Sequence, residues 1–150
     1  IDRCHAPYHG RLRALLDDTH ARFGAVYPLN CHSRPAAGGK MGEGAEGRPR
    51  ADFVLGDRDG TTCDPGFTEF VRATLVSMGY EVAVNDPYKG VELVRAYSDP
   101  DAGRHSLQVE VNKKLYMDEA TRAKHEGFDR LQANLGALLR AIAEFIARRR

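Results

Sequence analysis

Short apolar segments alternate with amphipathic segments along this chain, and this alternation is the feature that most constrains its fold. The apolar segments predict four strands, at residues 25–31, 52–56, 80–84 and 106–111. Apolar side chains at helical spacing predict three helices, at residues 8–23, 65–78 and 118–147. Strands that alternate with helices are typical of α/β proteins with a mainly parallel or mixed sheet. The sequence therefore predicts one α/β domain over residues 1–150, with helices flanking the sheet.

Composition narrows the class of protein further. The 150 residues are 42% hydrophobic and 29% charged, as in a globular domain with a buried core. The formal net charge of +1 gives no case for a nucleic acid or an anionic membrane as partner. No apolar run approaches the roughly 18 residues of a membrane-spanning helix. Three cysteines without C-x-x-C spacing fit reduced thiols, so we expect a cytoplasmic protein.

Polar side chains follow each predicted strand. They form four groups, at residues 32–33, 57–59, 85–88 and 110–112. In open α/β sheets, ligands bind outside the carboxyl ends of the strands. If the strands are parallel, the four groups meet at one edge of the sheet. The sequence then predicts a site there that combines an imidazole with several carboxylates.

His32 and Glu110 each allow more than one interpretation. Alternation along residues 107–112 places Gln108, Glu110 and Asn112 on one face of a strand and three apolar residues on the other. This pattern suits an edge strand with a solvated face, and it also suits a general base near a metal-bound water. His32, at a strand end, is a metal ligand, an acid–base group or a structural loop residue.

Four segments of the chain carry a more specific signal, because they occur in a fixed order. They read LNCHS at 29–33, DFVLGDR at 52–58, NDPYKG at 85–90 and LQVEVNKKLYM at 107–117. Together with Pro7-Tyr8-His9 before an amphipathic helix, these segments resemble the conserved blocks of the N-formylglutamate amidohydrolase family. The resemblance covers nearly all of residues 6–120. It implies the three-layer, phosphorylase/hydrolase-like α/β fold of the zinc carboxypeptidases and aspartoacylase.

The same resemblance implies an activity. Members of this family are zinc-dependent hydrolases that cleave the formyl amide of N-formylglutamate. The resemblance therefore implies that the substrate is N-formylglutamate or a similar N-acyl amino acid. In that scheme His32 would bind zinc, and Glu110 would be the general base that takes a proton from zinc-bound water. Arg95 would pair with a carboxylate of the substrate. Further substrate contacts would come from Ser33, Asn85 and Tyr88.

The chain departs from the family's pattern in ways that concern the metal and the substrate. A catalytic zinc site takes three protein ligands, and in the related hydrolases the first two lie upstream of everything in this sequence. We therefore expect the chain to be the C-terminal part of a longer enzyme, which supplies one ligand and the base. Asn30 stands where the family has aspartate, and Arg34 stands where it has an apolar residue. Residues 91–93 replace a glycine-rich continuation with Val-Glu-Leu. A non-catalytic fragment or binding domain of the same fold is therefore the alternative to an amidohydrolase.

Three smaller expectations complete the sequence-based prediction. Pro7 lies between His5 and His9 and argues against a helix there, which disfavours a metal site rebuilt from these histidines and Cys4. If strands of the fold are missing, an uncovered sheet edge predicts self-association into a homo-oligomer. The glycine-rich residues 36–50 predict a long loop that is either functional or disordered.

Overall fold

The computed structural model describes residues 3–37 and 50–149 of the chain. Its helices are α1 (His5–Phe23), α2 (Pro65–Ser77), α3 (Glu92–Ala96) and α4 (Gly127–Ala147). Its strands are β1 (Leu29–Arg34), β2 (Phe53–Gly56), β3 (Val82–Val84) and β4 (Leu107–Asn112). The predicted loop at 36–50 lies almost entirely outside the described residues.

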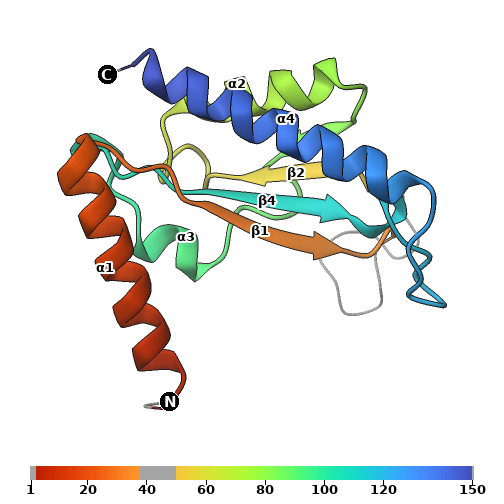
Figure 1. The fold of residues 1–150 in the computed structure, drawn as a ribbon, viewed down its shortest axis with the longest axis horizontal. Coiled ribbons are helices and arrows are strands. Elements are labelled where there is room, and N and C mark those ends of the chain that lie inside the picture. The colour runs from red at the N-terminus through yellow and green to blue at the C-terminus, as the bar shows by residue number, and fades with distance from the viewer. Residues whose placement is uncertain (1–2, 38–49, 150) are drawn as a thin grey trace.

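The four strands form one mixed sheet in the order β1-β4-β2-β3. β1 pairs with β4 in parallel and β2 pairs with β3 in parallel, whereas β2 and β4 are antiparallel. Figure 1 shows this directly, because the arrows of β1 and β4 point one way and that of β2 points the other. The α/β class with a mixed sheet is confirmed. The expectation that all four strand ends meet at one edge is wrong, because β2 ends beside Gln108 at the start of β4.

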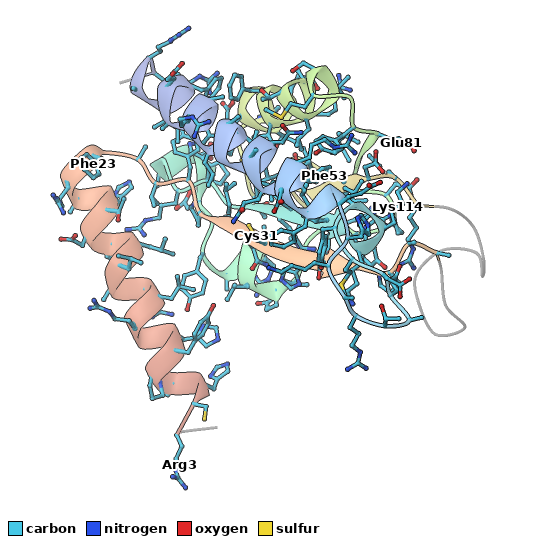
Figure 2. All side chains as sticks on the ribbon, turned by 45° about the vertical axis from the view of Figure 1, so that its right-hand side comes forward. Arg3, Phe23, Cys31, Phe53, Glu81 and Lys114 are labelled. Atoms are coloured by element: carbon cyan, nitrogen blue, oxygen red, sulfur yellow. The ribbon has the colours of Figure 1, made fainter. Side chains whose placement is uncertain are left out.

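The hydrophobic core lies between the sheet and the helices α2 and α4, which lie together over one face (Figure 1). Phe53 on β2 (Figure 2) contributes a fully buried side chain to this core, as does Leu55 on the same strand. Because the core lies on one face of the sheet, the opposite face can carry polar side chains.

Helix α2 begins at Pro65, and the side chain of Asp64 caps it by accepting a hydrogen bond from the backbone N–H of Phe67 at 2.9 Å.

Helix α1 lies beyond the end of the sheet at which β1 begins, and its first turns stand away from the rest of the molecule (Figures 1 and 2). His9 holds it to the segment after α3 through a 2.6 Å hydrogen bond between Nδ1 and the Tyr97 hydroxyl. The expectation that Pro7 excludes a helix is wrong. Pro7 occupies the first turn, where the backbone N–H that proline lacks has no helical partner.

Three elements differ most from the sequence-based prediction. The first strand spans Leu29–Arg34 rather than residues 25–31, so His32 lies inside β1 and not after it. The last helix begins at Gly127 rather than residue 118, because a 3-10 turn and a tight turn at Asp118 come first. The short helix α3 was not predicted, because its five residues are too few to show a helical period. Among the described residues, no helix is long and apolar enough to cross a membrane.

His105 gives the fold a predictable response to pH. The backbone N–H of Asp64 donates to Nδ1 of His105 at 3.2 Å, and the ring stacks on Tyr27 at 4.4 Å between centroids. Burial lowers the pKa of His105, and Arg149 also lowers it while Asp64 opposes the shift. The unfolded chain therefore takes up this proton more readily than the folded chain.

We expect the melting temperature to fall as the pH drops through and below the ordinary histidine range around 6.5. His105→Asn should melt lower than the native chain at pH 7.5, and its melting temperature should depend less on pH. The measurement is thermal unfolding followed by circular dichroism between pH 7.5 and 5, with exposed His5→Asn as the matched control. An unchanged pH dependence in His105→Asn would contradict this assignment.

Candidate active site

A ladder of polar side chains covers the sheet face opposite the core. Alternate residues of β1 and β4 point to this face, and the parallel register sets them side by side. The three cross-strand pairs are Asn30–Gln108, His32–Glu110 and Arg34–Asn112. The register thus brings together the imidazole and the carboxylate that the sequence singled out.

Glu110 is held in place by its neighbour on the same strand. The Gln108 side-chain amide donates to Oε1 of Glu110 at 2.9 Å, and its own oxygen accepts from the backbone N–H of Val91 at 2.9 Å. Nδ1 of His32 lies 3.9 Å from the same Oε1 of Glu110. The His32 side chain is 41% exposed and that of Glu110 is 9% exposed. A nearly buried carboxylate with a fixed orientation therefore lies next to an accessible imidazole.

The loop after β3 crosses this polar face and encloses a cavity of about 730 Å³. It lies directly on β2, because a Cβ added to Gly56 would meet the backbone of Lys89 and Gly90 at 2.8–2.9 Å. The cavity is lined by Arg58, Asp59, Thr61, Pro87, Tyr88, Lys89, Gly90, Val91, Gln108 and Glu110. Glu110 thus faces a cavity large enough for a small-molecule ligand.

Asn85 and Asp57 are among the polar residues predicted to form the site. They form a separate network just after the carboxyl ends of β3 and β2. The Asn85 side chain donates to Oδ1 of Asp57 at 2.7 Å and accepts from the Asp57 backbone N–H at 3.1 Å. Asp57 is buried and also accepts from the Thr68 hydroxyl at 2.9 Å. These contacts fix the two loops that follow β2 and β3, so Asn85 positions the cavity wall and does not line the cavity.

Ser33 and Arg95 lie away from the cavity. Ser33 is exposed on β1, and alternation directs its side chain to the face opposite His32. Arg95 lies on α3, where its Nε donates to Glu92 at 2.8 Å and both side chains are more than half exposed. Of the predicted substrate-binding residues, only Tyr88 lines the cavity.

Arg34 belongs to this face, although sequence analysis noted it only as a departure from the family's pattern. It is 3% exposed, and its Nη2 donates to the Ala51 carbonyl oxygen at 2.7 Å. Its guanidinium carbon lies 5.9 Å from the centroid of the Tyr88 ring, and that of Arg50 lies 5.4 Å from the same centroid. Burial, and then the charge of Arg50, lower the pKa of Arg34 below its usual value.

The described residues do not form a complete zinc site. A catalytic zinc takes three protein ligands. Among residues 3–37 and 50–149, no three His, Cys, Asp or Glu side chains are arranged to hold a metal ion. The rings of His5 and His9 lie 4.1 Å apart on α1 without a third donor in that part of the structure. His32 is thus the accessible nitrogen donor beside Glu110, and further ligands would have to come from outside the described residues.

Comparison with known proteins gives consistent matches. The family model described as N-formylglutamate amidohydrolase matches residues 1–117. N-formylglutamate deformylase of Pseudomonas putida is 31% identical over 79% of this chain and 43% of its own length. The Pseudomonas aeruginosa enzyme of the same name is 30% identical over 75% of this chain and 41% of its own.

A solved structure extends these matches to three dimensions. The crystal structure of N-formylglutamate amidohydrolase from Ralstonia eutropha is 47% identical, with a TM-score of 0.91. The match covers 99% of this chain and 54% of that one. The chain therefore spans about half the length of the relatives it matches.

Proposed function

Because the chain belongs to the N-formylglutamate amidohydrolase family, we propose that it carries the base and one metal ligand of an amidohydrolase acting on N-formylglutamate. The observation that carries this proposal is the His32–Glu110 pair, 3.9 Å apart beside a cavity of about 730 Å³. His32 and Glu110 are partners in the parallel register of β1 and β4, so the pairing of the two strands sets the distance between their side chains.

Glu110 is the proposed general base. Gln108 occupies Oε1 of the carboxylate, which leaves Oε2 to accept a proton. The carboxylate takes a proton from the attacking water and then delivers it to the amide nitrogen as the carbon–nitrogen bond breaks. The products are formate and glutamate. Partial burial of the carboxylate among other side chains favours this transfer by limiting competition from bulk water.

Zinc is the proposed cofactor, with His32 as one of its ligands. Support comes from the accessible imidazole beside Glu110 and from the preference of zinc for neutral histidine nitrogen. The remaining ligands would come from a partner copy or from polypeptide outside the described residues. We also propose a cytoplasmic location, which the three free thiols support.

The first experiment measures zinc per chain by elemental analysis after dialysis, together with formate release from N-formylglutamate. We expect the native chain to retain zinc and release formate, and His32→Ala to do neither. His5→Ala is the matched control, because His5 and His9 could bind metal independently. Loss of zinc in His5→Ala but not in His32→Ala would contradict the role of His32. A native chain without zinc and without formate release would favour the alternative, a non-catalytic domain of the same fold.

A further inference from the structure

Arg34 carries buried polar atoms that no group among the described residues satisfies. Its Nε and Nη1 are fully buried, and neither has a hydrogen-bond partner among the described residues. Unpaired buried donors are costly, and a charged donor costs more than a neutral one. Only Nη2 is used, by the Ala51 carbonyl oxygen. An anion such as a carboxylate would accept hydrogen bonds from these N–H groups and balance the charge of the guanidinium.

The position of Arg34 relates these donors to the reacting groups. Arg34 follows His32 by two residues on the same face of β1, which is roughly 6.6 Å along a strand. Its charge is close enough to Glu110 for the two to interact. The distal carboxylate of an extended N-formylglutamate lies at a comparable distance from its formyl group, whereas the α-carboxylate adjoins the scissile amide.

Tyr88 separates Arg34 from the cavity. Its ring lies against the Arg34 guanidinium and also forms part of the cavity wall. Tyr88 comes from the loop that crosses the sheet face, and its side chain is only partly buried. A rotation of this one side chain would connect the buried guanidinium with the cavity that contains Glu110.

Because Arg34 stands where the family has an apolar residue, we propose that it provides a contact particular to this chain, in which it binds the side-chain carboxylate of the substrate and strengthens the preference for acidic N-formyl amino acids over neutral ones. This inference rests on the proposed function for the identity of the ligand. It assigns the carboxylate to Arg34 in place of Arg95, whose guanidinium pairs with Glu92 on α3. Tyr88 acts as the movable wall that the carboxylate displaces.

The test compares N-formylglutamate with N-formylglutamine, in which a neutral amide of similar size replaces the side-chain carboxylate. Binding is measured by isothermal titration calorimetry, and turnover by formate release. We expect Arg34→Gln to weaken N-formylglutamate binding by roughly 10- to 100-fold, the effect of losing a charge-assisted hydrogen bond. N-formylglutamine binding should change little. Arg34→Lys should retain part of the preference for the acidic ligand, because it keeps the charge.

Two controls separate this role from a structural one. Arg72→Gln, on the exposed surface of α2, should leave both affinities unchanged. Thermal unfolding of Arg34→Gln reports any loss of fold, and Arg34→Lys remains informative if that variant unfolds. An equal loss for both ligands would overturn the inference. Weakening by Arg95→Gln but not by Arg34→Gln would also overturn it.

The outcomes distinguish the inference from the proposed function. Binding that depends on Arg34 without formate release would support the inference and reject the hydrolase. Formate release with unchanged discrimination in Arg34→Gln would support the hydrolase and reject the inference.

Discussion

Replacing Glu110 with glutamine is expected to lower kcat for formate release from N-formylglutamate by about 10²- to 10⁴-fold, the usual contribution of general acid–base catalysis. Glutamine keeps the size of the side chain and an oxygen that can accept the hydrogen bond from Gln108. The fold and the substrate affinity should therefore change little. A variant with a raised KM and an unchanged kcat would indicate that Glu110 binds substrate and does not transfer a proton.

The matched control for this prediction is Glu69→Gln. Glu69 is exposed on α2 and pairs with Arg72. Exposed ion pairs contribute little to stability, so this variant should keep both activity and melting temperature. Steady-state formate release and thermal unfolding of both variants check the prediction. Equal activity of Glu110→Gln and the native chain would reject Glu110 as the base.

Replacing Gly56 with alanine is expected to damage both stability and the site. The added Cβ would lie 2.8 Å from the backbone nitrogen of Gly90 and 2.9 Å from the Lys89 carbonyl oxygen. Backbone atoms cannot rotate out of the way as a side chain can, so the loop itself must move. Overpacking of this kind costs about 1–3 kcal/mol.

The loop displaced in Gly56→Ala carries two groups that define the site. Tyr88 would move relative to Arg34, and the backbone N–H of Val91 would move away from Gln108, the residue that orients Glu110. A shift of about 1 Å at a site can cost about 10²-fold in rate. We therefore expect a loss of kcat/KM beyond what the fall in folded population explains. Urea unfolding and formate release under native conditions measure the two effects separately.

Gly136→Ala is the control for Gly56→Ala. Gly136 lies within α4, where the nearest atom to an added Cβ is Nη1 of Arg140 at an ordinary 3.6 Å. Alanine there should raise stability by about 0.5–1 kcal/mol, because glycine is a poor helix former. The same substitution thus has opposite expected signs at the two glycines. A neutral Gly56→Ala would show that the loop does not depend on close contact with β2.

The hydrophobic patterns of the sequence determined most of the secondary structure. Segments 52–56 and 106–111 match β2 and β4 within a residue, because their burial requires apolar side chains at strand spacing. Asp64, Pro65 and Gly79 predicted the ends of α2, because capping and termination depend on local residue types. The predicted position of β1 was wrong by several residues. Val26 and Tyr27 are apolar because they pack in the tertiary structure, where Val26 forms an isolated bridge with Arg104 and the Tyr27 ring contacts Phe67.

The candidate site was only partly predictable for a related reason. The pairing of His32 with Glu110 follows from the register of β1 on β4, and the separation of Asp57 from both follows from the antiparallel pairing of β2. Neither relation has a local signature, because the paired residues lie far apart in the chain. The sequence around Arg34 likewise gives no sign that this arginine is buried, because its burial beside Tyr88 depends on the fold.

The sequence by itself determined the class of fold and the family, and it pointed to the two side chains proposed to react, because these depend on residue types at fixed local spacings. Only the tertiary structure decided which strand ends share a face, where the loop bearing Tyr88 lies and which arginine is buried beside that loop. Those properties depend on strand direction and on contacts between residues far apart in sequence. Strand direction and these long-range contacts are determined by the packing free energy of the whole domain, so they cannot be predicted from any short segment.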